Sequence, residues 1–185
     1  AKMAQDNGAQ LIDINMGCPA KKVVNGYSGS ALLKDIDHAL TLIDAVVAAV
    51  SVPVTLKTRL GWDDRIRNAP DLARRAEVAG IAMITIHGRT RCQFYKGKAD
   101  WVAIADVSQA VDIPVIANGD ITNDQTARTA MQSAQSAGVM IGRGAQGRPW
   151  LLSQVAAALE GRAPTTPPIS SITATPATVM AKLDH

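Results

Sequence analysis

Short apolar segments that end in polar or glycine-rich residues recur five times along the chain, and longer stretches of helical periodicity separate them. The apolar segments are QLIDINMG, PVTLKTRLG, IAMITIHG, IPVIANGD and GVMIGRG. Apolar runs of about four to eight residues between turn residues are typical of buried strands. Because neighbouring parallel strands need a long crossover, strands that alternate with helices predict an α/β protein with a parallel sheet.

Helical periodicity fills the intervals that follow the predicted strands. The most apolar of these stretches is interrupted by Asp44 and is too short to span a bilayer. The opening residues AKMAQDNG are typical of the last turns of a helix that Asn7 and Gly8 stop. We therefore expect further helices over residues 30–50, 69–79, 100–111, 124–134 and 149–159.

Every predicted strand ends in side chains that can bind or react. In parallel α/β proteins, ligands bind beyond the carboxyl ends of the strands. A doubly wound sheet uses mainly the two ends at its switch point, whereas a barrel gathers all of them around one mouth. We therefore predict a (β/α)8 TIM barrel, here a partial barrel of about five βα units, with three units expected before Ala1. The strand-end residues are Asn15, Cys18, Lys57, Arg59, His87, Arg89, Asn118, Asp120, Gly142 and Arg143.

Alternation within the first three strands supports this arrangement, because successive side chains of a strand point to opposite faces of the sheet. We expect the apolar set to pack against the helices and the polar set to point into the barrel mouth. The polar set is Asp13, Asn15, Thr55, Lys57, Arg59, Thr85 and His87, and the apolar set is Ile12, Ile14, Val54, Leu56, Ile84 and Ile86.

The composition changes near Gly161. Residues 161–185 are rich in Pro, Thr and Ser, which predicts a linker or a disordered tail with a short helix near residues 179–183. Residues 1–160 are expected to form the catalytic domain.

The bulk composition is typical of a mildly basic globular protein. The chain is 47% hydrophobic and 19% charged, with a formal charge of +3, which is compatible with an RNA partner but does not establish one. Its two cysteines, Cys18 and Cys92, have no Cys/His cluster around them, so neither a disulfide framework nor a metal site is expected. We expect a cytoplasmic protein without a membrane segment.

The segment IGRGAQGRPW, residues 141–150, spells the G-x-G-x-x-G pattern of a dinucleotide-binding turn. That fingerprint belongs to a first βα unit and needs an acidic residue at the end of the next strand, but here the loop closes the last unit. A terminal loop in a barrel is instead typical of a mononucleotide phosphate site, with Arg143 adding charge. Flavin mononucleotide (FMN) is the natural candidate, and a plain tight turn is the alternative.

Five motifs in the same order resemble those of the bacterial tRNA-dihydrouridine synthases, with the B-type branch nearest. This resemblance runs from about Gly8 to Leu152. It implies a TIM barrel that uses FMN, reduced by NADPH, to convert uridine of tRNA to 5,6-dihydrouridine. The motifs are NMGCPAKKV, LKTRLGWDD, IHGRTR, IANGDI and IGRGAQGRPW.

The resemblance also implies a role for each strand-end residue. Asn15 would help to orient the uracil, and Cys18 would donate the proton to C5. Lys57 and Arg59 lie where their charges could stabilise the negative charge that develops on the uracil carbonyl oxygen. The flavin would be held by Lys57, His87, Asn118, Asp120, Gly142 and Arg143.

Basic residues near the predicted mouth are expected to contact tRNA phosphates, because phosphate neutralisation needs cations. These are Lys21, Lys22, Arg89 and Arg91, and solvated surface positions are the alternative. The sequence departs from the family pattern at Ala137, where an aspartate is usual, and lacks the amino-terminal strands and a helical carboxyl-terminal domain. A monomer is expected.

Two other functions fit some of the same residues. Lys57 could be the Schiff-base nucleophile of a barrel aldolase or lyase. An inactive, truncated RNA-binding remnant is the non-enzymatic alternative. Taken singly, Cys18 could be a small buried hydrophobe, His87 a hydrogen-bonded core residue and Lys57 a surface side chain with a packed stem.

Overall fold

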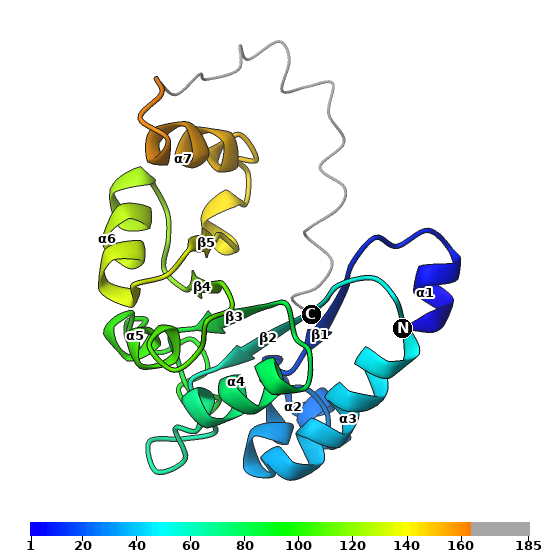
Figure 1. The fold of residues 1–185 in the computed structure, drawn as a ribbon. Helices are drawn as coiled ribbons and strands as arrows, with labels where there is room; N and C mark the ends of the chain where they lie inside the picture. Colours follow the sequence, from blue (N-terminus) through cyan, green and yellow to red (C-terminus); the bar gives the residue numbers. More distant parts are fainter. Residues whose placement is uncertain (164–185) are drawn as a thin grey trace.

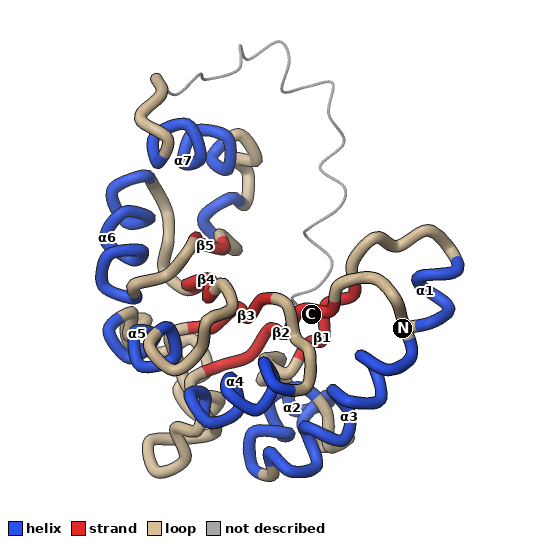
Figure 2. Tube along the Cα trace, in the orientation of Figure 1, coloured by secondary structure: helices blue, strands red, loops and turns tan. Residues whose placement is uncertain are grey.

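A parallel sheet of five strands in the order β1-β2-β3-β4-β5 organises residues 1–163, the part of the chain that the computed structural model describes. The strands follow the chain order, and helices connect them along one side of the curved sheet (Figure 1; Figure 2). This is the predicted α/β fold, and successive βα units of this kind are consistent with a partial (β/α)8 barrel. The strands are β1 (Ile12–Asn15), β2 (Val54–Arg59), β3 (Met83–His87), β4 (Val115–Asn118) and β5 (Gly138–Met140).

The helices largely occupy the expected intervals. A capping box between Asn123 and Thr126 begins the helix at residues 124–134, so this helix has the bounds that the sequence predicts. The helices are α1 (Lys2–Asp6), α2 (Lys21–Val24), α3 (Ile36–Ala49), α4 (Ala69–Val78), α5 (Val102–Ser108), α6 (Asp124–Ala134) and α7 (Leu151–Leu159), with 3-10 turns η1 (Gly29–Lys34) and η2 (Arg143–Ala145).

One expected helix is divided. The stretch predicted as a helix over residues 30–50 consists of η1 followed by α3. Asp35 separates the two because its backbone is not helical and its carboxylate accepts a hydrogen bond from the amide of His38, which is N-cap geometry. Helical periodicity alone did not reveal this break, and the short helix α2 was not predicted.

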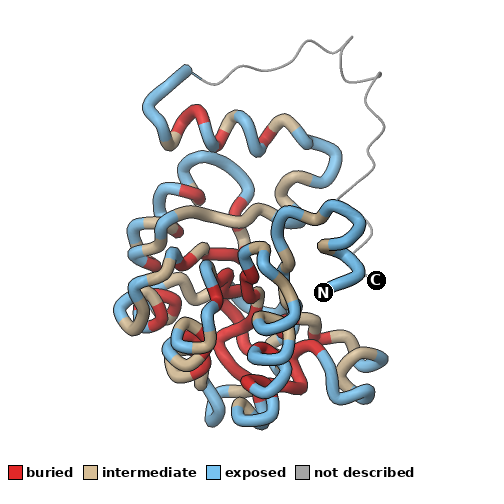
Figure 3. Tube along the Cα trace, turned by 45° about the vertical axis from the view of Figure 1, so that its right-hand side comes forward, coloured by how far each residue is buried: buried red, intermediate tan, exposed pale blue. Residues whose placement is uncertain are grey.

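Apolar side chains from the outer side of the sheet form the main core with the helices. Leu56, Ile84 and Ile86 are fully buried and belong to one cluster with Ile43 of α3 and Leu72 of α4. Each such side chain contributes roughly 1.5–3 kcal/mol of hydrophobic stabilisation. Figure 3 shows this buried zone along the strands, with exposed residues mainly on the outer turns of the helices. The predicted partition of apolar residues towards the helices is therefore confirmed for β2 and β3.

A second, smaller cluster fixes the carboxyl-terminal elements. Ile121, Ala127, Ala130, Leu151 and Val155 pack together, joining α6 to α7. Residues 164–185 of the predicted tail, which include its predicted short helix, lie outside the described residues. No helix within residues 1–163 has the length and apolar character needed to cross a membrane.

Candidate active site

The strand register brings together the polar residues predicted from the sequence. Asn15 of β1 is paired with Lys57 of β2, and two residues further along, Arg59 is paired with His87 and His87 with Asn118. Neighbouring strands lie about 4.8 Å apart, and residues two apart on a strand share a face. These five residues therefore lie on one face of the sheet near its carboxyl edge.

The loop after β1 holds Cys18 in a defined turn. The side-chain oxygen of Asn15 accepts hydrogen bonds from the amides of Gly17 (2.9 Å) and Cys18 (3.2 Å). The carbonyl oxygen of Cys18 accepts from the amide and the hydroxyl of Ser30, at 3.0 and 2.8 Å. Asn15 thus uses its oxygen to position the Cys18 turn. The Cys18 residue remains partly exposed and its thiol is not in a disulfide.

Arg59, which was predicted to act on the substrate, is buried and binds backbone carbonyls of the protein. Its side chain is 2% exposed, Nε donates to the carbonyl of Gly17 (2.8 Å), and one terminal nitrogen donates to the carbonyls of Thr90 (3.1 Å) and Phe94 (2.9 Å). Burial is the main cause that lowers the pKa of Arg59 to about 10, so the guanidinium stays charged at neutral pH. Arg59 joins the Cys18 turn to the loop between β3 and α5.

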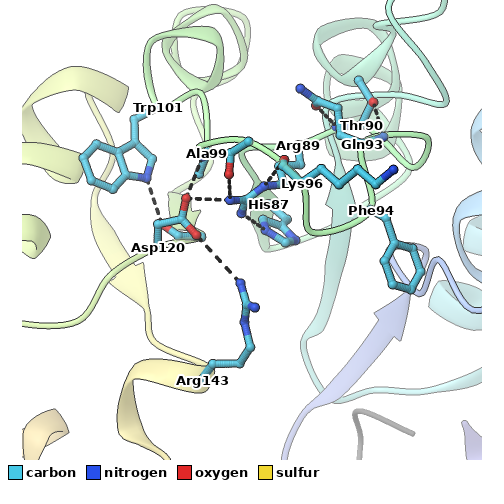
Figure 4. Close-up of polar contacts among 12 residues, drawn as sticks. His87, Arg89, Thr90, Gln93, Phe94, Lys96, Ala99, Trp101, Asp120 and Arg143 are labelled. Carbon is cyan, nitrogen blue, oxygen red and sulfur yellow. Dashed lines mark hydrogen bonds and ion pairs between the residues drawn. The ribbon is translucent and has the colours of Figure 1, made fainter.

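Arg89, which was predicted to contact tRNA, is also buried. The residue is only 2% exposed, so its guanidinium is not accessible to an RNA phosphate in this arrangement. It donates to the carbonyls of Lys96 (3.1 Å) and Gly97 (2.7 Å) and pairs with a carboxylate oxygen of Asp120 at 2.7 Å (Figure 4). Its buried donors are satisfied within the protein, as buried charges require.

Asp120 connects the ends of three strands. One carboxylate oxygen accepts from Arg89 and from the amide of Ala99 (2.7 Å), and the other lies 3.8 Å from a guanidinium nitrogen of Arg143 (Figure 4). Burial raises the pKa of Asp120, but these hydrogen bonds and the charges of both arginines outweigh it, so the pKa lies below its ordinary value. Asp120 is therefore a carboxylate that orients two cations.

His87 is neutral in this environment. Burial is the largest cause that lowers its pKa to about 3, and the positive charges of Arg59, Lys57 and Arg89 add to it, while Asp120 opposes them. The ring packs against the backbone of Gly119, where an added Cβ would lie 2.9 Å from Cδ2. An imidazole in this state serves as a hydrogen-bonding group and not as a cation.

The glycine loop after β5 is more open. A Cβ built on Gly142 would meet no atom within 4 Å, whereas one on Gly144 would lie 2.3 Å from the carbonyl oxygen of Ile121. Gly144 is therefore required for close packing, and the backbone around Gly142 is accessible. The side chain of Arg143 is 55% exposed. Asn118 supports this loop from β4 by donating to the carbonyl of Met140 at 2.8 Å.

Tyr95 is a site residue that the sequence reasoning missed. Its ring lies 4.8 Å from the guanidinium carbon of Arg143, 5.7 Å from that of Arg59 and 6.4 Å from the ring of His87. It comes from the β3–α5 loop, and Phe94 packs against it edge to face at 4.7 Å. The adjacent aromatic pair in an otherwise polar loop was the available signal, because the whole chain has only two Tyr and one Phe, and two of these three residues are neighbours here.

The remaining basic residues lie at the surface. Lys21 and Lys22 are exposed on α2. Arg91 is partly buried, with its guanidinium carbon 4.8 Å from the ring centre of Trp62, and the ammonium of Lys34 lies 3.9 Å from the same ring. The structure therefore places Lys21, Lys22 and Arg91, unlike Arg89, where at least part of the side chain reaches solvent.

Within residues 1–163, no group of three or more His, Cys, Asp or Glu side chains is arranged to hold a metal ion. Cys92 is exposed in the β3–α5 loop. Donors and cations dominate the site, an arrangement suited to an anionic or carbonyl-rich ligand.

Solved structures share the fold at low sequence identity. A mandelate racemase/muconate lactonizing enzyme from Labrenzia alexandrii matches 87% of this chain and 38% of its own, with a TM-score of 0.60 and 17% identity. A phosphonopyruvate hydrolase matches 72% of this chain and 50% of its own, with a TM-score of 0.52 and 20% identity. At these identities the likeness concerns the fold alone.

Curated relatives are much more similar in sequence. The Rhodobacter capsulatus protein named "Probable tRNA-dihydrouridine synthase" is 63% identical over 163 residues, which cover 88% of this chain and 50% of the relative. The "tRNA-dihydrouridine synthase B" of Xanthomonas campestris is 53% identical over 168 residues, 91% of this chain and 51% of the relative. The chain spans about half the length of these relatives.

The family comparison extends over almost the whole sequence. The model described as "Dihydrouridine synthase (Dus)" matches residues 1–183. This match confirms the resemblance that the five strand-end motifs indicated. The chain belongs to the dihydrouridine synthase family.

Proposed function

We propose that the protein to which this chain belongs reduces uridine of tRNA to 5,6-dihydrouridine, with FMN as its bound cofactor and NADPH as the reductant. The observation that carries this proposal is the register of the sheet, which gathers Asn15, Lys57, His87 and Asn118 on one face beside the Cys18 turn. The names of the relatives support the reaction. Residues 1–160 are proposed to be the catalytic part.

The available groups fit a flavin mononucleotide. A phosphate suits the accessible backbone around Gly142 and the exposed guanidinium of Arg143, which Asp120 orients. Lys57 and His87 lie on β2 and β3, which pair with each other, where they could contact the carbonyl-rich ring of the flavin. Asn118 would act through its support of the β5 loop, and Asp120 through the two arginines.

A reduced flavin bound at this site would supply a hydride to C6 of the uracil. As that hydride arrives, negative charge develops on the C4 carbonyl oxygen and at C5. Lys57 is the cation proposed to stabilise this charge. Arg59 is buried and adds positive charge near the site. Its proposed role is indirect, because it binds the two loops that border the substrate.

Protonation of C5 completes the reaction, because the C5=C6 double bond has then gained one hydride and one proton. The Cys18 thiol is the proposed acid, and Asn15 and Ser30 fix its backbone. Lys21, Lys22 and Arg91 are proposed to contact the phosphates of the tRNA.

The test compares Cys18→Ala with Cys92→Ala in the full-length protein. We expect Cys18→Ala to lower dihydrouridine formation by about 100- to 10,000-fold, the usual contribution of a general acid, while NADPH still reduces the flavin. Cys92→Ala is the matched control and should retain full activity, because Cys92 lies on the exposed part of a loop.

Mass spectrometry of tRNA nucleosides measures the product, and the flavin absorbance band measures reduction. Undiminished product with Cys18→Ala would remove Cys18 from the mechanism. A colourless full-length protein that forms a borohydride-trapped adduct at Lys57 with a carbonyl substrate would favour the aldolase alternative instead.

A further inference from the structure

We propose that Arg89 is a positioning residue that holds His87 as its neutral Nδ1–H tautomer, so that the ring offers a single N–H donor to a carbonyl of a pyrimidine-dione ring. The identity of this ligand rests on the proposed function. The tautomer itself does not, because it follows from the contacts of Arg89 within the protein.

The contact between the two side chains defines which nitrogen carries the proton. A terminal guanidinium nitrogen of Arg89 lies 3.3 Å from Nε2 of His87 (Figure 4). A guanidinium has five N–H donors and no acceptor. Nε2 must therefore accept the hydrogen bond and carry no proton, which leaves the ring proton of a neutral imidazole on Nδ1.

The guanidinium is held in this orientation from three sides. Its other donors are engaged by the carbonyls of Lys96 and Gly97 and by the carboxylate of Asp120, which the amide of Ala99 holds in turn. Rotation that released His87 would break charge-assisted hydrogen bonds in a buried setting, where each is strong. Arg89 is thus a fixed donor at Nε2.

The contacts of the His87 ring with Arg89 and with Gly119 both involve its Nε2–Cδ2 edge. The Nε2–Cδ2 edge packs against Gly119, where a Cβ would lie 3.1 Å from Nε2. Within residues 1–163, the ring forms its hydrogen bond through Nε2. His87 shares its sheet face with Lys57 and Asn118, so its ring lies on the proposed ligand side of the sheet, and Nδ1 is the ring nitrogen that the contact with Arg89 leaves for a ligand.

The surrounding charges disfavour the alternative of a doubly protonated ring. Arg59, Lys57 and Arg89 are the cations near His87, and Asp120 is the one acidic group that favours its protonation among the causes acting on it. Asp120 is already paired with Arg89. A neutral donor can bind a carbonyl without adding another charge to this cationic cluster. Both the flavin ring and uracil carry such a pyrimidine-dione carbonyl edge.

The first experiment measures the tautomer in the full-length protein before flavin is added. Nitrogen-15 NMR of the histidine rings distinguishes a protonated from an unprotonated ring nitrogen, and the spectrum of His87→Gln assigns the His87 signals. Between pH 5.5 and 8 we expect a single form of the His87 ring, with Nδ1 protonated and Nε2 unprotonated. An imidazolium or an Nε2–H ring would overturn the proposal.

The second experiment compares Arg89→Lys with Arg75→Lys. A lysine ammonium is a compact charge that does not reproduce the planar fork spanning Asp120, two carbonyls and Nε2, so we expect Nε2–H or imidazolium signals of His87 to appear. Arg75 forms an exposed ion pair with Asp37 and is the matched control, which should leave the ring unchanged. An Arg89→Lys variant with the original single tautomer would show that Arg89 does not set it.

Two ligand arms identify the acceptor. FMN and uridine 5′-monophosphate are added separately to the labelled protein, and the Nδ1–H signal is followed. A shift with FMN alone assigns the carbonyl to the flavin, and a shift with the uridine nucleotide assigns it to the substrate. If both probes bind, as judged from other signals, and neither moves Nδ1–H, the donor role is wrong although the tautomer assignment and the proposed function stand separately.

Discussion

Two loops at the carboxyl edge of the sheet differ in how far they are buried and held by hydrogen bonds from the rest of the protein. The β3–α5 loop, residues 88–101, contains buried Arg89 and Thr90, and side chains of Arg59, Arg89 and Asp120 bind its backbone. The β5–α7 loop, residues 141–150, contains no fully buried residue. Its Arg143 is half exposed and lies 3.8 Å from Asp120.

This difference in burial and hydrogen bonding suits the two loops to different tasks. A loop whose polar groups are already satisfied can hold a neighbouring side chain such as His87 in one state before a ligand arrives. An exposed glycine loop with an accessible cation can adapt its backbone to a phosphate. Asp120 connects the two loops, because its two oxygens contact Arg89 and Arg143 respectively.

The largest expected effect tests the ion pair between buried Arg89 and Asp120. Arg89→Met would remove the charged partner of Asp120 and the donor to two carbonyls, and we expect a loss of about 3–5 kcal/mol in the free energy of unfolding. Arg143→Met removes only a long, exposed ion pair and should cost less than about 1 kcal/mol. Urea unfolding of both variants measures the two values. Equal losses would contradict the contrast between the loops.

A glycine pair gives a smaller effect. Gly119 and Gly147 both have positive φ, 115° and 70°, so alanine should cost roughly 1–2 kcal/mol of backbone strain at each. At Gly119 the new Cβ would also lie 2.8 Å from the Cβ of Ala99 and 2.9 Å from His87, whereas at Gly147 it meets nothing within 4 Å. We expect Gly119→Ala to lose about 1–3 kcal/mol more than Gly147→Ala in thermal or urea unfolding. A loss at Gly119 no larger than that at Gly147 would show that the β3–α5 loop shifts to accommodate the added methyl group.

A third effect is a dependence of stability on pH, which is gradual because it accumulates unit by unit as pH falls. The pKa of His87 is about 3 in the folded chain against an ordinary value of 6.5, so below pH 6.5 the unfolded chain binds the extra proton. The stability contributed by neutral His87 is therefore complete above pH 6.5 and is lost as pH falls towards 3, with a slope of up to about 1.4 kcal/mol per pH unit. His87→Gln should flatten this slope between pH 6 and 4.5, measured by urea unfolding at each pH. An unchanged slope would assign it to other groups.

Much of the fold and part of the site could be predicted from the sequence. The five apolar runs correspond to the five strands, and α6 has its predicted bounds because local capping residues set them. The grouping of Asn15, Lys57, His87 and Asn118 also followed from the sequence, since side-chain alternation and parallel pairing are regular. These features depend on residues close in the chain or on a repeating geometry.

Other features depended on contacts between distant segments. Arg59 and Arg89 resemble exposed strand-end cations in the sequence, yet both are buried. Carbonyl groups of two other loops bind the guanidinium of Arg59, and Asp120 of another loop joins two carbonyl groups further along the same loop in binding that of Arg89. Tyr95 reaches Arg143 for the same reason, since loops after different strands meet at one edge of the sheet. The sequence by itself determined the order of the elements and which residues share a face. Only the tertiary structure decided which cations reach the solvent and which are buried and bound within the protein, because a long side chain binds whatever acceptors the packed loops bring within its reach.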